Sequence, residues 1–220
     1  MNSHFAYDKI MQNDVKTRLL LLLSLFFCLF GCISYFMWDD FFISHAHLSL
    51  KPYALGFKCI SFLASPPLHA IALALLLLAS RFALIDTKKR FFFFELSCSQ
   101  CLGVICAHMM KILIGRPRPH TALTHPQLGF QWGVYDHQFH SFPSGHTMFI
   151  FILAVSLSLY YPRFALYFLI GAFLIASSRF FLLKHYPSDV LITATLAIWI
   201  EQISHSMLKK VKIFRKNNVI

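Results

Sequence analysis

The stretch KILIGRPRPH, residues 111–120, lies where the apolar run 91–114 ends, and it places Lys111, Arg116 and Arg118 beside two prolines. The planar fork of arginine matches phosphate oxygens two at a time, and the prolines stiffen the backbone that presents it. Cations also mark the ends of many membrane helices, because their apolar stems follow the hydrocarbon surface. The stretch therefore predicts either an anion site or an ordinary helix end.

The composition is that of a membrane protein. Of the 220 residues, 57% are hydrophobic and only 13% are charged, which is more apolar than a soluble domain of this size can bury. A helix of about 20 apolar residues crosses a hydrocarbon core about 30 Å thick. We therefore predict an all-α, polytopic membrane protein with six transmembrane helices. The predicted spans are Leu19–Trp38, Leu68–Ile85, Phe91–Ile114, Thr147–Tyr161, Ala165–Leu183 and Val190–Leu208.

The basic residues predict the orientation of these spans. The formal net charge is +11, and most lysines and arginines precede the first span or follow the second, fourth and sixth. With an even number of spans these groups lie on one side, which the positive-inside rule makes cytoplasmic. Both termini are then cytoplasmic: residues 1–18 form an N-terminal segment and residues 209–220 a basic tail of one membrane-embedded domain, 1–220. Charge placed in this way indicates a lipid bilayer and no nucleic-acid partner.

Two predicted exterior loops carry polar residues that suit a phosphate group. The first contains FHSFPSGHT, residues 139–147, with the run Pro143-Ser144-Gly145-His146. This pattern is typical of a turn with a serine cap on the next helix. It is also typical of an anion site, because a helix N-terminus offers free N–H groups, glycine permits a close approach and serine adds a donor. His146 is then placed to carry a proton.

The second exterior loop, SRFFLLKHYPSD at residues 178–189, contains a histidine and an aspartate four residues apart. Pro187 favours a helix start, so Asp189 can simply complement the helix dipole. Alternatively, its carboxylate accepts a hydrogen bond from one nitrogen of His185 and leaves the other nitrogen free to attack, as in a catalytic triad. Arg179 lies in the last turns of a span, where a charge needs a partner and a bound phosphate would supply one.

Together these residues resemble the three signature motifs of the type 2 phosphatidic acid phosphatase superfamily, which includes lipid phosphate phosphatases and bacterial undecaprenyl-diphosphate and lipid A phosphatases. The motifs are Lys111, six residues, Arg118-Pro119; then Pro143 to His146; then Ser178-Arg179, five residues, His185, three residues, Asp189. The order and spacing match throughout, and the six-span layout covers nearly the whole chain.

The resemblance implies a role for each of these residues. The histidine corresponding to His185 attacks phosphorus, the acid corresponding to Asp189 orients it, and His146 matches the general acid that protonates the leaving oxygen. The residues that match the cradle for the phosphoryl oxygens are Lys111, Arg118, Ser144, Gly145 and Arg179. Arg116 lies outside the motif, and we interpret it as a further phosphate ligand or a contact to lipid headgroups.

The implied chemistry needs no metal and no cofactor. The loop between Lys111 and His146 is nevertheless rich in histidine, which on composition alone favours a zinc site. The histidines in question are His120, His125, His137 and His140. Their spacing matches no recognised ligand pattern, so we predict that they bind no metal.

The resemblance implies a lipid phosphatase of the bacterial inner membrane that acts at the periplasmic face through a phosphohistidine intermediate. Candidate substrates are lipid A 1-phosphate, undecaprenyl diphosphate and phosphatidylglycerol phosphate; the sequence neither ranks them nor indicates an oligomeric state. One alternative is a lipid phosphotransferase that uses the same intermediate on His185. Another is a non-catalytic phosphate-binding membrane protein or transporter, which the lack of an inverted repeat disfavours.

Overall fold

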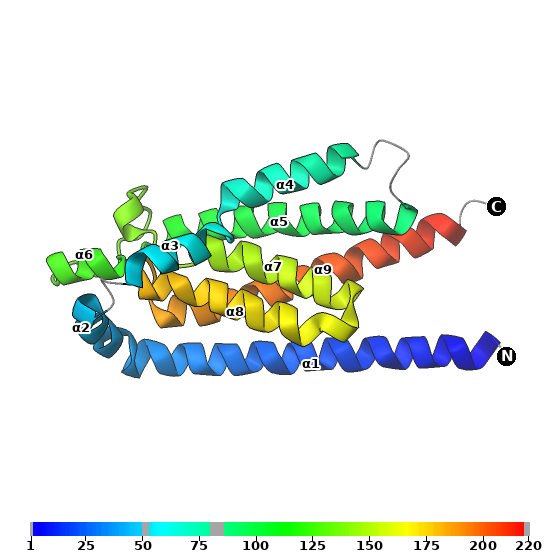
Figure 1. The fold of residues 1–220 in the computed structure, drawn as a ribbon, viewed down its shortest axis with the longest axis horizontal. Coiled ribbons are helices and arrows are strands. Elements are labelled where there is room, and N and C mark those ends of the chain that lie inside the picture. The colour runs from blue at the N-terminus through cyan, green and yellow to red at the C-terminus, as the bar shows by residue number, and fades with distance from the viewer. Residues whose placement is uncertain (1, 50–52, 80–85, 218–220) are drawn as a thin grey trace.

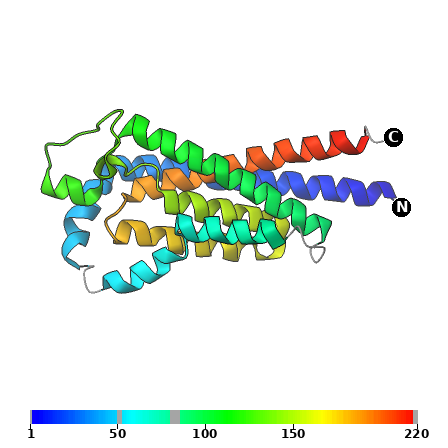
Figure 2. The same ribbon diagram turned by 90° about the horizontal axis from the view of Figure 1, so that it is seen from above.

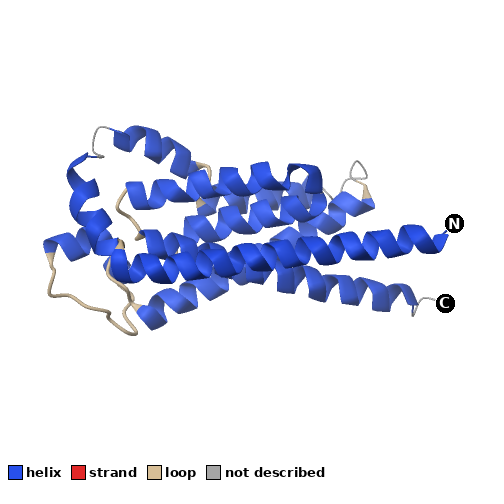
Figure 3. Cartoon of the chain, turned by 90° about the horizontal axis from the view of Figure 1, so that it is seen from below, coloured by secondary structure: helices blue, strands red, loops and turns tan. Residues whose placement is uncertain are grey.

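The computed structural model describes residues 2–49, 53–79 and 86–217, and in these ranges the chain forms helices and loops without any strand (Figure 3). In chain order the elements are α1 (Asn2–Met37), α2 (Asp39–Ser49), α3 (Ala54–Phe62), α4 (Pro66–Ala79), α5 (Thr87–Ile114), α6 (Pro119–Thr124), the 3-10 turn η2 (His137–Phe139), α7 (Gly145–Tyr160), the 3-10 turn η3 (Pro162–Phe164), α8 (Ala165–Phe181) and α9 (Pro187–Asn217). The all-α prediction is therefore confirmed.

The long helices run along one axis of the molecule and form a bundle, as Figure 1 and Figure 2 show. Helix α1 begins and helix α9 ends at the same end of this bundle. The short helices α2 and α6, and the loop between α6 and α7, lie at the opposite end. The two ends of the described chain therefore lie together, as an even number of spans requires.

Each predicted span falls on a helix, namely α1, α4, α5, α7, α8 or α9. Within the described residues, four helical segments are long and apolar enough to cross a membrane: Thr17–Met37, Ala54–Leu75, Thr87–Thr124 and Pro162–Phe181. Helix α7 is apolar but shorter. The membrane-protein prediction thus has a structural basis, whereas the count of six spans stays a prediction.

The segment Ala54–Leu75 differs from the predicted span Leu68–Ile85, because it joins α3 to the first part of α4. Residues 80–85 of the predicted span Leu68–Ile85 lie outside the described residues. Helix α3 packs against α8, where the ring of Phe57 stacks on that of Phe181 at 4.8 Å. Helix α2 reaches the same helix end, with the ring of Phe42 set edge-on to Phe180 at 5.3 Å. Helices α2 and α3 therefore pack against the same end of α8.

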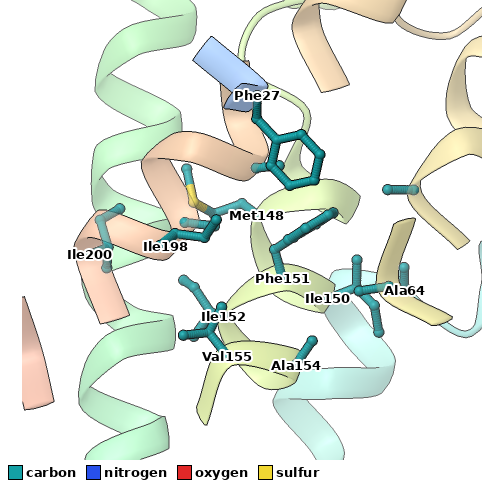
Figure 4. Close-up of a cluster of buried hydrophobic side chains, with 14 of the residues drawn as sticks. Phe27, Ala64, Met148, Ile150, Phe151, Ile152, Ala154, Val155, Ile198 and Ile200 are labelled. Carbon is teal, nitrogen blue, oxygen red and sulfur yellow. The ribbon is translucent and has the colours of Figure 1, made fainter. Parts of the chain in front are cut away.

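The core of the bundle surrounds α7. Its fully buried side chains include Met148, Phe151, Ile152 and Val155 (Figure 4). The ring of Phe27 in α1 meets that of Phe151 edge-on at 5.7 Å. At Gly103 of α5, a Cβ atom would lie 2.6 Å from Cδ1 of Ile152, so the absence of a side chain lets the two helices approach closely. Helix α7 is thus held from several sides, which fixes the position of its N-terminus.

Large apolar side chains also face outward from the bundle. Leu22 and Leu29 of α1 are 62% and 60% exposed, and Leu166 and Leu174 of α8 are 67% and 62% exposed. In water a continuous apolar surface of this kind promotes association, but in a bilayer it contacts hydrocarbon. The outer surface of the bundle therefore fits a lipid environment.

Candidate active site

The three predicted motifs come from separate segments that meet at one end of the bundle, the end that carries α2 and α6 (Figure 1). Lys111 lies in the last turn of α5, and Arg179 lies in the last turn of α8. Ser144 caps α7, and Asp189 lies in the first turn of α9. Because these are all helix ends, the polar side chains gather outside the apolar middle of the bundle.

A glycine turn at the end of α5 leads into the segment that carries Arg116 and the motif residue Arg118. Gly115 adopts a left-handed conformation with φ of 55°, and its N–H donates to the carbonyl of Lys111 at 3.0 Å. A Cβ atom here would lie 1.6 Å from the carbonyl oxygen of Gln131, so only glycine fits. The backbone N–H of Arg118 then donates to the carbonyl of Gln138 at 2.8 Å, which anchors the segment that follows.

Three cations form the centre of the site. Lys111, Arg118 and Arg179 lie close enough for their charges to act on one another. The Nε atoms of Arg118 and Arg179 are buried without a hydrogen-bond partner, and one terminal nitrogen of Arg179 donates to Oγ of Ser61 at 2.5 Å. Within the described ranges, no carboxylate forms a salt bridge with any of the three. Repelling, partly buried cations of this kind are stabilised by a bound anion.

The Pro143-Ser144-Gly145-His146 turn borders this centre. A Cβ atom on Gly145 would lie 3.8 Å from Nζ of Lys111, so the glycine faces the cations. The fully buried Ser144 has its hydroxyl oxygen at the helix cap, where it accepts from Oγ1 of Thr147 at 2.9 Å. Its own N–H donates to Oγ1 of Thr193 at 3.0 Å. Gly145 is therefore better placed than Ser144 to meet an anion, although the predicted donor role of Ser144 stays a prediction.

His185 is only 3% exposed, and its orientation is fixed. Its Nδ1 lies 2.5 Å from the carbonyl oxygen of Ser141. Because a carbonyl only accepts, Nδ1 carries the hydrogen and Nε2 keeps its lone pair. Burial lowers the pKa of His185 well below its usual value, and the charges of Arg179 and Arg118 add to this effect. The imidazole is therefore neutral, which is the state that a nucleophile needs.

Asp189 lies beside His185 but does not accept the hydrogen bond predicted from the four-residue spacing. Its Oδ2 is 4.0 Å from Nδ1 of His185, whose hydrogen goes to Ser141 instead. The carboxylate is 0% exposed and accepts from Oγ of Ser141 at 2.5 Å, from the N–H of Tyr186 at 3.0 Å and from Arg116 at 2.5 Å. Burial raises the pKa of Asp189, and Arg116 opposes the rise.

A neutral, oriented imidazole beside cations that form no salt bridge within the described ranges is an arrangement that suits phosphoryl transfer. Residues 92–213 match the PAP2 superfamily. The chain belongs to this superfamily. Lipid A 1-phosphatases of Rhizobium johnstonii and Rhizobium etli are 30% identical over 95 residues, which is 43% of this chain but only 39% and 41% of the two relatives.

Two solved structures resemble this chain in fold. The crystal structure of Aquifex aeolicus LpxE matches 76% of this chain and 93% of its own, with a TM-score of 0.57 and 22% identity. The phosphatidylglycerolphosphate phosphatase from Bacillus subtilis, a transmembrane PAP2 protein, matches 87% of this chain and 96% of its own, with a TM-score of 0.56 and 17% identity. At such identities the likeness supports the fold alone.

The other motif histidine, His146, lies in the first turn of α7, directly before the predicted span Thr147–Tyr161. Burial and the charges of Arg179 and Lys111 lower the pKa of His146 to about 3. A phosphate bound to those two cations would reverse their effect, because its negative charge favours the imidazolium. A bound anion would therefore shift His146 toward the imidazolium, whereas burial continues to favour the neutral ring.

The loop histidines do not converge on a metal site. Nε2 of His140 pairs with the carbonyl of Val134 at 3.0 Å, and its ring lies 5.6 Å from that of His137. In the described part of the chain, no three His, Cys, Asp or Glu side chains are placed to share an ion. His120 lies in the first turn of α6, and His125 directly follows that helix.

Several residues of the site were not predicted from the sequence. They are Asp39, Ser61, Ser141, Ser188 and Thr193. Arg116, interpreted as a phosphate or headgroup ligand, instead forms ion pairs with Asp39 at 2.7 Å and with Asp189 at 2.5 Å. The sequence signal for Asp39 was its place directly after the first predicted span, because an acid at the edge of the membrane needs a partner.

Proposed function

We propose that this PAP2 protein hydrolyses a lipid phosphate through a phosphohistidine on His185. The observation that supports the proposal most strongly is the neutral imidazole of His185, with its Nδ1 hydrogen accepted by the carbonyl of Ser141, next to three cations that no carboxylate in the described ranges pairs with. A phosphate bound to these cations would lie within reach of the Nε2 lone pair. Fixed positive charge at the phosphoryl oxygens then stabilises the transition state.

The proposed reaction has two steps. In the first, Nε2 of His185 bonds to phosphorus, the bond from phosphorus to the lipid oxygen breaks, and His146 gives its proton to that oxygen. In the second, His146 takes a proton from water, the water oxygen bonds to phosphorus, and the bond to His185 breaks with release of phosphate. Because Lys111, Arg118 and Arg179 supply the positive charge, we propose that neither step requires a metal ion.

The membrane arrangement is part of the same proposal. We propose six spans, with both termini in the cytoplasm and the site at the periplasmic face of a bacterial inner membrane. It is supported by the common location of the ends of α1 and α9, opposite to the site (Figure 1), and by the basic residues at that common end. A lipid in the outer leaflet would then present its phosphate at the level of the cations.

Among the candidate lipids we place lipid A 1-phosphate first, because the curated relatives that match are lipid A 1-phosphatases. The test is release of inorganic phosphate from lipid A 1-phosphate, undecaprenyl diphosphate and phosphatidylglycerol phosphate by the purified protein in detergent with excess EDTA. We expect turnover of at least one lipid, and none by His185→Ala. Loss of turnover in EDTA with recovery in zinc would contradict the metal-free mechanism. Transfer of phosphate to a lipid hydroxyl without free phosphate would identify a phosphotransferase.

A further inference from the structure

Arg116 has a side chain that is enclosed by protein groups. It is 7% exposed, and one terminal nitrogen donates to Oδ1 of Asp189 at 2.5 Å and to Oγ of Ser188 at 2.8 Å. The other donates to Oδ2 of Asp39 at 2.7 Å. Its flat face lies 3.8 Å from the centre of the Tyr186 ring. Its charged fork is thus occupied by carboxylates and is not open to a phosphate.

Asp39 completes this arrangement from the start of α2. It is 2% exposed and accepts from Oγ of Ser34 at 3.1 Å, from Oγ of Ser188 at 2.5 Å and from the N–H of Ser188 at 3.1 Å. That N–H belongs to the first turn of α9 and has no acceptor within its own helix. A carboxylate from α2 therefore caps the helix that carries Asp189.

The contacts of Arg116 continue to His185. The N–H of Ser141 donates to the carbonyl of Arg116 at 3.0 Å, and Oγ of Ser141 donates to Oδ2 of Asp189 at 2.5 Å. The carbonyl of Ser141 in turn accepts the Nδ1 hydrogen of His185. Arg116 thus contacts both groups that set the charge and the orientation around His185: Asp189 through its side chain and Ser141 through its backbone carbonyl.

Asp189 has few charged neighbours, so the loss of Arg116 would have a large effect. The titratable and charged groups that face it are Arg116 after α5, Arg118 before α6, Asp39 in α2, and His185 and Tyr186 before α9. Among them, Arg116 alone forms a salt bridge with both Asp39 and Asp189. Without it two buried acids would face each other, an arrangement that favours protonation of one of them.

We propose that Arg116, balanced by Asp39, is a positioning residue of the site: its side chain keeps Asp189 charged, and the charged Asp189 accepts from Ser141 and so holds the carbonyl of Ser141 where it orients His185 with Nε2 toward phosphorus. This inference rests on the proposed phosphatase activity. It differs from the interpretation of Arg116 as a ligand of the substrate phosphate, and the two make opposite predictions for KM and kcat.

The first experiment compares Arg116→Gln with Arg118→Gln, and uses Arg163→Gln, at an exposed site in η3, as a matched control. For Arg116→Gln we expect kcat to fall about 10–100-fold near pH 7, the usual cost of a small misplacement of reacting groups, while KM stays nearly unchanged. The acid limb of its pH profile should move to higher pH, since Asp189 then ionises later. Arg118→Gln should raise KM, and Arg163→Gln should behave as wild type.

The second experiment measures thermal stability against pH and needs no turnover. In Arg116→Gln the pKa of Asp189, already raised by burial, loses its main opposing charge. A group with a raised folded-state pKa stabilises the fold at low pH and loses that contribution as the pH rises through this pKa. The melting temperature of the variant should therefore fall further below wild type at pH 8 than at pH 5. A second substitution, Asp39→Asn, should reduce that difference.

Each outcome decides the inference. A rise in KM equal to that of Arg118→Gln, with kcat kept, would make Arg116 a substrate ligand and overturn it. A stability loss equal at pH 5 and pH 8 would overturn the charge-holding role. If Arg116→Gln does not fold, Arg116→Lys, which keeps the charge but not the fork, should show an intermediate loss of kcat. If the wild-type protein hydrolyses no lipid phosphate, the proposed function fails, and the melting curves still test the pairing of Arg116 with Asp189.

Discussion

Replacement of Asp189 by asparagine tests how the site activates His185. The substitution keeps the shape of a fully buried side chain and removes its charge. In the proposed mechanism the imidazole changes from neutral to positive as Nε2 bonds to phosphorus, and the carboxylate 4.0 Å from Nδ1 would stabilise that change. We therefore expect Asp189→Asn to lower kcat and to leave KM nearly unchanged.

The expected magnitude follows from that distance. Two unit charges 4 Å apart interact by about 4 kcal/mol at an effective dielectric constant near 20. If about half of the positive charge has developed in the transition state, the loss is about 2 kcal/mol, or about 30-fold in kcat. Asparagine also cannot accept from Arg116, Ser141 and Tyr186 as a carboxylate does, which adds about 1–2 kcal/mol. The kcat of Asp189→Asn should therefore lie between that of the wild type and that of His185→Ala.

The assay is phosphate release by purified protein, together with acid-quench trapping of radiolabelled phosphate on the enzyme. We expect Asp189→Asn to form the labelled intermediate more slowly and His185→Ala to form none. Asp40→Asn, at an exposed neighbouring carboxylate, is the matched control and should retain full activity. A wild-type kcat for Asp189→Asn would refute the electrostatic reasoning, and label that persists on His185→Ala would refute the role of that histidine.

Three further predictions test other parts of the site. His146→Ala should lower kcat about 10²–10⁴-fold for a lipid substrate and much less for p-nitrophenyl phosphate, whose leaving group needs no proton; an equal loss on both would exclude general acid catalysis. Gly145→Ala should weaken phosphate binding about 10–100-fold, which is the value of one hydrogen bond to a charged group, because its methyl group would lie 3.8 Å from Nζ of Lys111. The melting temperature of this variant should not fall, since alanine favours helix. A cysteine in place of Gln131 should react with an impermeant maleimide from outside the cell and one in place of Asn217 only after permeabilisation; the reverse labelling would invert the proposed orientation.

The residues of the three motifs could be predicted because each lies at a helix end that the sequence itself marks. The apolar runs predict where α5 and α8 end, and Gly145 and Pro187 mark where α7 and α9 begin. Helix ends of an antiparallel bundle meet in two layers, so Lys111, Arg179 and Asp189 were expected on one face. The structure places them there, at the end opposite to the start of α1 (Figure 1).

The hydrogen bond from His185 to Asp189 was one of two interpretations of the four-residue spacing, and the structure gives the Nδ1 hydrogen to Ser141 for a local reason. Residues four apart face each other only inside a helix. Helix α9 begins at Pro187, so His185 precedes it and its ring follows the path of the loop. Ser141, from a segment 44 residues earlier, enters between the two side chains and bonds to both. The spacing within the third motif therefore could not predict the position of Ser141.

The role of Asp39 could not be predicted from the PAP2 motifs, because it lies outside residues 92–213, which match the superfamily. Yet the motif region alone would leave Arg116 facing only Asp189, and that pair would carry no net charge to stabilise a positive His185. With Asp39 added, two carboxylates share one arginine, and the group keeps one negative charge. In the proposed mechanism, Asp39 at the junction between α1 and α2 is the acid that lets Arg116 hold Asp189 in place while Asp189 still acts electrostatically on His185.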